Sequence, residues 1–503
     1  SEALCGLHSS GLRWSERLAD VLREMGYFTS KCEKDIWMRD KGDHYKYIAV
    51  YVNDPMIASN DPEAIVNMLM EKHQFKLKGT GPTKFHLGCD FFRDEEGALC
   101  YAPKKYIEKI LENYCRIYGA WPKPATSPLT AGDHPELDTS ELLNEDDQKI
   151  YQSLIGAPQR VIQIGRFAIQ TAVMTLSRFR AMPRQGHLDR VKRIHGYLSK
   201  MRHVTIKIRT DAPDYSNIPV KMYGWECSCY ADAKEEIPLD APKSKGKPVN
   251  MTSFFDANLY HDLISGKSVT GILHQLNKTP IDWYSKLQLT VETATFSSEF
   301  VATRTCTEQV IDFRLTLRYL GVPINGPTVV LGNNESVINS AAIPHSKMHK
   351  RWVALSYHGV RYADAAGIIN IHHIAGKKNP ADILSKHWDL PSVWNAMKPL
   401  LFWNWKLMAP NTEEAKEGSN IEQKDVAKLV SKLDAKYNVK VTAQGKGQKS
   451  NHSLIEGSDN GTISSVIQST NQSRVPSSRP RADVRPEGKD ARSNPEHKVE
   501  RKR

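Results

Sequence analysis

The sequence has 503 residues, 40% of them hydrophobic, which is enough for about three domains with apolar cores. Its formal net charge of +12 suits a polyanionic partner, although a basic surplus is also common in proteins that merely stay soluble. The longest strongly apolar run, residues 400–409, is far too short to span a bilayer, and no signal peptide opens the chain. The composition therefore excludes a membrane-spanning protein.

Cysteine usage and the first residue indicate the compartment and the completeness of the chain. The eight Cys are scattered and include no CxxC pair, which argues against a disulfide scaffold or a zinc ribbon and for a reducing compartment. The location within the cell, cytoplasm or nucleus, stays open. The chain begins with Ser1, and its first lines read like the middle of a domain, so we expect a fragment of a longer polypeptide.

Residues 1–121 show an α+β pattern. Apolar side chains recur at helical spacing over residues 14–27, and residues 46–59 read as two strands joined by a turn. Residues 85–103 alternate like a second hairpin, and residues 103–119 return to a helical period. The sequence predicts a small α+β region here.

The next part of the chain is predicted to be a linker and a group of helices. Residues 122–147 are rich in Pro, Thr, Asp and Glu, which is typical of a linker. Residues 148–249 carry two helical patterns and form the predicted helical connection. Pro158 lies inside the first pattern and should kink or break that helix.

Residues 250–405 are predicted to form a mixed sheet flanked by helices. Three strands joined by hairpins come first, followed by helices that alternate with strands, an order that favours a sheet with helices on its faces. The predicted strands are 250–258, 268–277, 280–289, 328–334 and 367–374, and the predicted helices are 292–320, 352–363 and 380–388.

The tail from 406 to 503 is polar. Beyond about Thr442 it is Ser, Gln, Asn, Gly, Pro and charged residues, a composition that buries too little apolar surface to offset the entropy of ordering. We expect it to be mostly disordered, with one amphipathic helix over residues 420–437.

Four acceptor side chains stand at the ends of different elements of the mixed-sheet region. Asp256 ends a strand, Glu299 lies in the long helix, Asn333 follows another strand and Asp382 starts the last short helix. Such side chains can converge above a sheet and bind two Mg²⁺ ions for phosphodiester hydrolysis. The alternative is that each is a helix cap or a solvated charge, and the spacing alone does not decide between the two.

The order of several motifs resembles a known family. "SFFDAN", "IDWYSK", "SSEFVA", "LGNNES" and "HHIAGKKNPADILSK" resemble the ribonuclease H domain of Ty1/copia-type retrotransposon Pol polyproteins. "YIAVYVNDPMIAS", "FHLGCDFF" and "YQSLIGAPQRVIQIGRFAI" resemble the end of the reverse transcriptase of the same elements. The resemblance covers about residues 1–405, and it is specific because many motifs occur in the family's order.

The resemblance implies a domain order. Residues 1–121 would be part of a reverse-transcriptase palm and thumb region, followed by the linker and the helical connection. Residues 250–405 would be a ribonuclease H-like domain, and the tail has no counterpart. The resemblance also implies Mg²⁺ as cofactor, an RNA–DNA hybrid or other nucleic acid as partner, and an N-terminal Pol portion that this chain lacks.

The resemblance implies site residues and departures from the family. Asp54 matches one polymerase metal ligand, whereas Asn53 stands where the family has Asp and offers no charge to a divalent ion. Pro55 removes a backbone N–H and would disturb the hairpin. In the ribonuclease H part, Asp256, Glu299 and Asp382 match family metal ligands, and Asn333 stands where the family has Asp.

Other departures also indicate a degenerate copy. Ala168 stands where the family commonly has an acid, and Pro158 and Arg160 enter a helix that is normally apolar. These last two would destabilise the helix unless their positions are exposed here. By resemblance His349, Lys350, Arg351 and Arg361 would contact the backbone of a hybrid, with solvated surface charge as the alternative.

We therefore expect a degenerate fragment of a Pol polyprotein. Its ancestral activities would be RNA-directed DNA synthesis and cleavage of RNA in RNA–DNA hybrids, with polymerase activity lost and ribonuclease H activity impaired. The alternatives are a non-catalytic nucleic-acid-binding or adaptor protein derived from a retroelement, and a relic with no selected role.

Overall fold

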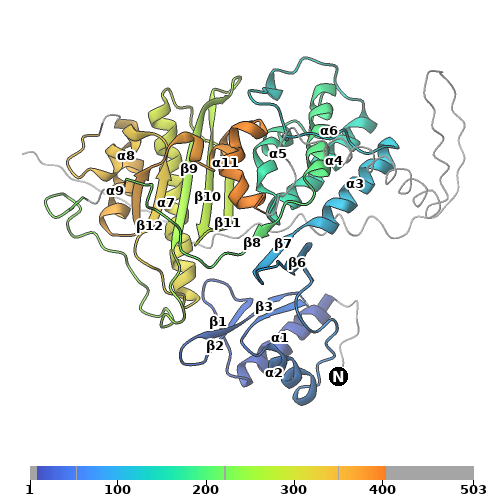
Figure 1. The fold of residues 1–503 in the computed structure, drawn as a ribbon, viewed down its shortest axis with the longest axis vertical. Helices are drawn as coiled ribbons and strands as arrows, with labels where there is room; N and C mark the ends of the chain where they lie inside the picture. The colour runs from blue at the N-terminus through green and yellow to red at the C-terminus, as the bar shows by residue number, and fades with distance from the viewer. Residues whose placement is uncertain (1–7, 53, 220–222, 349–350, 404–503) are drawn as a thin grey trace, which may run out of the picture. The chain divides into compact units, whose positions relative to one another are not determined.

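The computed structural model describes residues 8–52, 54–219, 223–348 and 351–403 (Figure 1). The predicted tail and its helix, Asn53, His349 and Lys350 lie outside the described residues. The described chain forms three sheets and a set of helices, which confirms the mixed α and β class expected from the sequence. None of the described helices is long and apolar enough to cross a membrane.

The N-terminal region is a four-stranded antiparallel sheet, in the order β1-β2-β3-β4, with helices against it. Leu18, Val21 and Leu22 are buried on one side of the first helix, which is why the apolar spacing of that segment gives a helix. Asp61 caps the second helix by accepting from the N–H of Ala64 at 3.1 Å. The elements are α1 (His8–Glu24), β1 (Phe28–Thr29), β2 (Ile36–Asp40), β3 (Tyr45–Tyr51), β4 (Asp54–Ala58), α2 (Pro62–Asn67) and η1 (Met68–Lys72).

The expectation that Pro55 disturbs the β3–β4 hairpin is wrong. Pro55 pairs with Val50, and Tyr51 pairs with Asp54 beside the turn. The strand β4 is the last in the sheet order, so it has a partner on one side only. Because an edge strand leaves alternate N–H groups without a ladder partner, it accepts a proline that a central strand would exclude.

A second sheet joins segments that are far apart in the sequence. Cys100 and Tyr101 pair with Lys207 and Ile206, so the sheet order β5-β6-β7-β8 brings in a strand that comes after the helices. The helices between these strands share one core with the last described helices, which lie between residues 382 and 401. The elements are β5 (Phe85–His86), β6 (Cys89–Arg93), β7 (Leu99–Ala102), α3 (Lys104–Tyr118), η2 (Pro135–Leu137), α4 (Glu145–Gln163), η3 (Phe167–Ile169), α5 (Gln170–Ser177), α6 (Gln185–Lys200) and β8 (Ile206–Lys207).

The expectation that Pro158 breaks its helix is wrong, because α4 continues to Gln163. Pro158 is buried within the helix, among neighbours that belong to the large core. An interior proline costs about 3 kcal/mol, which the packing of a long amphipathic helix can outweigh. Arg160 avoids the core, since its guanidinium donates to the side chain of Gln163 at 3.0 Å and to the carbonyl of Leu87 at 3.1 Å.

Between β8 and the mixed sheet, the described residues form turns and irregular structure, so the helices of the predicted 148–249 connection end with α6 at Lys200. Glu235 anchors this segment by accepting from Arg314 at 2.8 Å through each oxygen, and it also pairs with Arg318. Trp225 donates its indole N–H to Asp364 at 3.1 Å. The segment is therefore held by ionic and polar contacts instead of secondary structure.

The mixed sheet has the strand order β11-β10-β9-β12-β13 (Figure 1). The first three strands pair antiparallel as successive hairpins, and the last two are parallel, as the predicted order of elements requires. The elements are β9 (Met251–Asp262), β10 (Lys267–Leu276), β11 (Thr279–Leu287), α7 (Thr295–Tyr319), β12 (Thr328–Gly332), α8 (Glu335–Ala342), η4 (Arg351–Val353), α9 (Ala354–Ala365), β13 (Ile369–His373), η5 (Gly376–Lys378), α10 (Asp382–Ser385) and α11 (Leu390–Leu401).

Both faces of this sheet are covered. Phe255 and Ile272 belong to a core shared with α7, α8 and α9, while Leu273, the neighbour of Ile272, belongs to the core shared with α4, α5, α10 and α11. Successive strand residues point to opposite faces, so the apolar strands β9 and β10 supply two cores at once. Side chains at the ends of these strands are therefore held between packed layers.

His195 on α6 is a buried imidazole that gives the fold an acid-sensitive point. Its ring is 0% exposed, its Nδ1 lies 3.0 Å from the carbonyl of Val191 and its Nε2 has no partner in the described residues. Burial lowers the pKa of His195 to about 4. Between this pKa and the ordinary value near 6.5, the unfolded chain binds a proton that the folded chain does not, so stability falls as the pH falls.

We predict that His195→Phe will reduce the loss of stability on acidification. At pH 5 the variant should recover about 2 kcal/mol of the free energy of unfolding that the parent chain loses relative to pH 7.5, because one fewer proton is taken up on unfolding. Urea unfolding at both pH values measures this difference. His345→Phe, at an exposed position, is the control. An unchanged pH dependence in His195→Phe would contradict the assignment.

Candidate active site

Asp256 on β9 is the centre of a polar cluster buried beside the mixed sheet. It is 1% exposed, and both of its oxygens accept hydrogen bonds. Oδ1 accepts from the amide of Asn333 at 3.2 Å, and Oδ2 accepts from the hydroxyl of Ser385 and lies 3.1 Å from the ammonium of Lys386. Three donors from two different segments thus converge on one carboxylate.

Asp382 reaches the same cluster from α10. Its Oδ1 accepts from Lys386 at 2.9 Å, one helical turn further along the chain. Burial, reinforced by the nearby carboxylate of Asp256, raises the pKa of Asp382 to about 6. Burial acts on Lys386 in the opposite sense, but Asp256 and Asp382 raise the pKa of its ammonium above the ordinary value. The ammonium is therefore charged and bridges two carboxylates.

Gly271 allows α10 to lie this close to the sheet. It pairs directly with Asp256 across the β9–β10 ladder. A Cβ at Gly271 would lie 2.7 Å from each of three backbone atoms, in Ala381, Leu384 and Ser385. Only a residue without a side chain permits this approach.

Asn379 ties the strand to the start of the helix. Its side chain is 1% exposed, donates to the carbonyl of Phe255 at 2.9 Å and accepts from the N–H of Ala381 at 3.1 Å. These two backbone groups belong to the residues immediately before Asp256 and Asp382. The spacing of the two carboxylates is thus fixed through the main chain.

Glu299 on α7 is the third carboxylate of the cluster. It is 3% exposed, and its Oε2 has no hydrogen-bond partner in the described residues. Burial, and after it the charge of Asp256, raises the pKa of Glu299 well above its ordinary range. An unpartnered carboxylate oxygen beside two other carboxylates is the arrangement that a bound cation would relieve.

Asn333 occupies the fourth position, immediately after β12. Gly332 ends that strand against the ring of Phe255, where an added Cβ would lie 2.1 Å from the ring and displace it. The amide of Asn333 donates a hydrogen bond to Asp256 and adds no charge to the cluster. An aspartate there would instead bring a fourth negative charge, which needs a cation to be stable.

The structure thus brings together Asp256, Glu299, Asp382 and Asn333, the four side chains singled out in the sequence. Three carboxylates, one of which has an unpartnered buried oxygen, are suitable donors for a divalent ion. Within the described ranges, however, no three acidic, His or Cys groups are arranged as a ready cation cage. The ammonium of Lys386 and the amide of Asn333 already take up the oxygens of Asp256.

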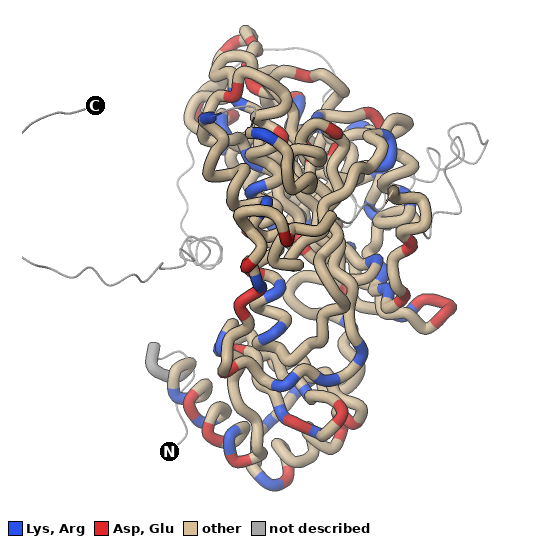
Figure 2. The backbone as a smooth tube through the Cα atoms, turned by 90° about the vertical axis from the view of Figure 1, so that its left-hand side faces the viewer, with Lys and Arg blue, Asp and Glu red and all other residues tan. Residues whose placement is uncertain are grey.

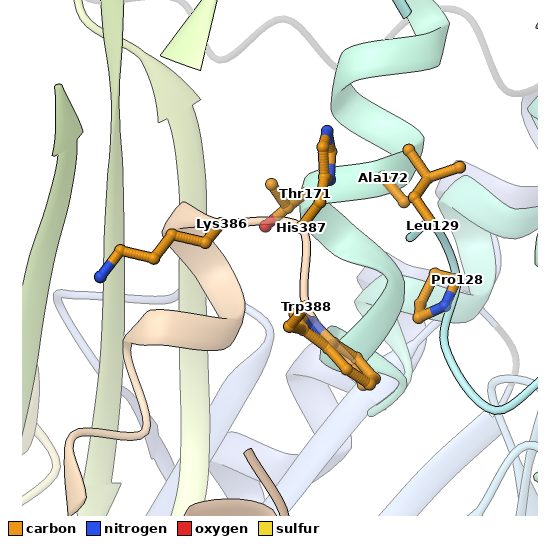
Figure 3. Close-up of a pocket in the computed structure, with 8 residues that line it drawn as sticks. Pro128, Leu129, Thr171, Ala172, Lys386, His387 and Trp388 are labelled. Atoms are coloured by element: carbon orange, nitrogen blue, oxygen red, sulfur yellow. The ribbon is translucent and has the colours of Figure 1, made fainter. Parts of the chain in front are cut away.

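Sequence reasoning missed three members of this cluster, Asn379, Ser385 and Lys386. Lys386 follows Asp382 by four residues, so its position on the same side of a helical turn was available as a signal. Figure 3 shows Lys386 extending away from His387 and Trp388, which line a small pocket with Thr171. Thr171 on α5 also donates to the carbonyl of Ile383 at 3.1 Å and so holds α10 from its other side.

The N-terminal candidate site is only partly described. Asp54 begins β4 and is exposed beside the turn of the hairpin, whereas Asn53 lies outside the described residues. Val52 has a positive φ of 54°, a left-handed conformation that places the turn next to Asp54. The hairpin is present, but the pair of side chains at its tip is not described as a unit.

The predicted contact of Arg361 with nucleic acid is wrong. Arg361 is 2% exposed, and its guanidinium donates to the carbonyls of Ser340 at 2.8 Å and Ile343 at 2.7 Å. The rings of Trp225 and Tyr357 lie 4.7 and 4.8 Å from it. Carbonyl oxygens and ring faces compensate the buried charge, so Arg361 has a structural role.

The other predicted nucleic-acid contacts are not decided by the structure. Arg351 is exposed in η4, and His349 and Lys350 lie outside the described residues. Figure 2 shows Lys and Arg interspersed with Asp and Glu along the described backbone, so the charge pattern of that part alone defines no binding face.

Known proteins with similar sequences indicate the ancestry of the chain. Residues 1–125 match the family model of reverse transcriptase (RNA-dependent DNA polymerase). The chain is 25% identical over 388 residues to the retrovirus-related Pol polyprotein from transposon RE1 of Arabidopsis thaliana, a match that covers 76% of this chain and 24% of that protein. It is 24% identical over 395 residues to the corresponding polyprotein from transposon TNT 1-94 of Nicotiana tabacum, covering 77% and 27%.

The chain is a relative of retrotransposon Pol polyproteins. It spans about a quarter of the length of these two Pol polyproteins. A putative transposon Ty5-1 protein of Saccharomyces cerevisiae is 26% identical over 250 residues, covering 49% of this chain and 75% of that protein. The ancestry expected from the motif order is confirmed.

Solved ribonuclease H structures align with the chain at low overall similarity. LC11-RNase H1 in complex with an RNA/DNA hybrid is 16% identical with a TM-score of 0.23, covering 27% of this chain and 94% of that one. The N-terminal RNase H domain of rv2228c from Mycobacterium tuberculosis is 12% identical with a TM-score of 0.22, covering 30% and 97%. The fold is therefore described from the strand order of this chain, β11-β10-β9-β12-β13.

We predict that Gly271→Ala will destabilise this Pol relative by about 1–3 kcal/mol, because the added methyl meets backbone atoms of α10 that cannot move independently. Thermal and urea unfolding measure the loss. Gly359→Ala is the matched control, since Gly359 is exposed on α9 with no atom within 4 Å of an added Cβ. The control should be neutral or stabilising by up to about 1 kcal/mol. Equal stability of the two variants would show that α10 does not depend on Gly271.

Proposed function

We propose that the chain is a degenerate piece of a retrotransposon Pol polyprotein that engages RNA–DNA hybrids at the mixed sheet, with weakened ribonuclease H activity and no DNA synthesis. The observation that carries this proposal is the convergence of Asp256, Glu299 and Asp382 with Asn333 in the fourth position. The reverse-transcriptase match and the Pol relatives support the same ancestry.

A cluster of carboxylates suits phosphodiester hydrolysis of a nucleic acid, because it can hold divalent cations. When bound, divalent cations such as Mg²⁺ at a site of this kind activate the attacking water and stabilise the leaving oxygen in phosphodiester hydrolysis. Asp256, Glu299 and Asp382 would hold them, since Asp256 and Glu299 are buried carboxylates and Asp382 is a half-buried one of the same cluster. Asn333 supplies no charge, so affinity and rate should be reduced.

At the β3–β4 hairpin, which resembles that of reverse transcriptase, we also expect a reduced affinity for divalent ions. Asp54 offers one carboxylate at an exposed turn, and the residue before it is Asn53. One carboxylate and one amide make a poor site for two divalent ions, which is why we propose that DNA synthesis is absent.

We predict that Asn333→Asp will raise cleavage of an RNA–DNA hybrid in Mg²⁺ by more than about 10–100-fold, the range for loss of a supporting interaction at a metal site. Gel analysis of an end-labelled hybrid under single-turnover conditions measures the rate. Asn333→Asp combined with Asp256→Asn is the matched control and should return the rate to background. Primer extension by the parent chain should give no product.

The outcomes separate this proposal from its alternatives. Cleavage that appears in Asn333→Asp and disappears in the double variant supports a ribonuclease H site reduced by one charge. Absence of cleavage in both would overturn the catalytic assignment, and Mg²⁺-dependent primer extension by the parent chain would overturn the loss of DNA synthesis.

A non-catalytic nucleic-acid-binding role is the second candidate. It is favoured by Lys386, which lies between the carboxylates, and by the net charge of +12. Hybrid binding that weakens with salt, without cleavage by Asn333→Asp, would favour this role, because release of counterions accompanies contacts with phosphates.

A further inference from the structure

The ammonium of Lys386 lies between the carboxylates of Asp256 and Asp382. Its Nζ is 3.1 Å from Oδ2 of Asp256 and 2.9 Å from Oδ1 of Asp382, although the side chain as a whole is 37% exposed. The charged end therefore turns inward, toward the sheet, as Figure 3 shows. A long flexible side chain with access to water adopts this position because two carboxylates attract it.

We propose that Lys386 is a built-in cation that competes with divalent metal ions for Asp256 and Asp382, and so holds the cluster in a metal-independent form. This inference deepens the proposed function and rests on it for the identity of the metal ligands. It concerns the binding of the ion, and its test does not depend on cleavage of nucleic acid.

Both oxygens of Asp256 are already hydrogen-bonded within the protein. They accept from Asn333, Ser385 and Lys386, three donors for a carboxylate with about four acceptor sites. Asn333 and Ser385 are neutral, so Lys386 alone supplies the compensating charge. A divalent ion reaching Asp256 and Asp382 must displace this ammonium or accept its repulsion at close range.

The position of the lysine is enforced by the fold. Lys386 follows Asp382 by four residues and directly follows Ser385, whose hydroxyl also reaches Asp256. Since α10 lies on Gly271 and is tied to β9 by Asn379, the root of the side chain stays next to the cluster. The local concentration of this cation is therefore independent of the solution.

Lys386 leaves one carboxyl oxygen of the cluster, on Glu299, without a partner in the described part of the chain. This atom is Oε2, and the hydrogen bonds and ion pairs of Lys386 go to Asp256 and Asp382. One unit of charge is thus opposed to three carboxyl groups, and the unpartnered Oε2 of Glu299 stays available to a divalent ion. Competition, rather than complete exclusion, is the expected result.

The test compares Lys386→Met with Lys378→Met, in the full chain. Both variants lose one positive charge, but Lys378 is exposed in η5 and has no ion pair with the cluster among the described residues. Binding of Mn²⁺ is measured by the loss of the electron paramagnetic resonance signal of the free ion. We expect Lys386→Met to bind Mn²⁺ at least about tenfold more tightly than the parent chain, because a like charge that contacts the same two carboxylates is removed. Lys378→Met should bind like the parent.

Thermal unfolding supplies the second readout. In the presence of a chelator, Lys386→Met should have a lower melting temperature than the parent chain, because Asp256 and Asp382 lose their counter-charge. Mn²⁺ should then raise its melting temperature more than that of the parent. Equal Mn²⁺ affinity in Lys386→Met, Lys378→Met and the parent would overturn the proposal, as would a Mn²⁺-induced shift that is no larger in Lys386→Met.

Chemical labelling tests the parent chain without substitution, which matters if Lys386→Met fails to fold. Acylation of lysines and subsequent peptide mapping should show slower labelling of Lys386 than of Lys378 in a chelator, and added Mn²⁺ should accelerate labelling of Lys386 alone. Fast labelling of Lys386 in the chelator would overturn the proposal. Since none of the three readouts uses a hybrid, loss of hydrolytic function would leave these results unchanged and would be seen separately in the cleavage assay.

Discussion

The close approach of α10 to β10 is the constraint on which the candidate site depends. Asp256 lies opposite Gly271 in the sheet, and the missing side chain of that glycine leaves the space that the helix backbone fills. Asn379 completes the arrangement by joining the carbonyl before Asp256 to the N–H before Asp382. The carboxylates are therefore placed by main-chain contacts, which tolerate changes in the charged side chains themselves. The geometry therefore does not depend on a charged side chain at position 333.

Charge balance then decides what the geometry can do. Two buried carboxyl groups and the half-buried one of Asp382 repel one another, and the pKa values of Glu299 and Asp382 are both raised by burial and by their neighbour Asp256. The chain offsets part of this repulsion internally, through the amide of Asn333 and the ammonium of Lys386. Each of these donors makes the metal-free fold more stable and the cluster less attractive to an ion from solution. Stability and metal binding are thus opposed at this site, a common situation at functional sites.

Features that arise from local pattern could be predicted from the sequence. The hairpins, the long helix α7 and the positions of Asp256, Glu299, Asn333 and Asp382 could be inferred, because strand alternation, helical spacing and motif order are local properties. The two-residue strand β8 could not, since it exists only through pairing with β7 about a hundred residues earlier. The structural role of Arg361 could not be predicted either. A basic residue beside an apolar helix face is typical of a surface contact, but the ring of Trp225, from a distant irregular segment, covers Arg361. Pro158 and Pro55 were misjudged because their cost depends on packing and on the position of a strand in its sheet.

The shortest α-helix of the described chain also sets how long the site stays assembled. Asp382, Ser385 and Lys386 all come from a single turn, α10 and the residue after it, so they leave or join the cluster together. Local opening of so short an element needs far less free energy than unfolding the sheet beneath it. The lifetime of the site is then the lifetime of one helical turn, and any ligand that prefers the assembled carboxylates acts by slowing its opening.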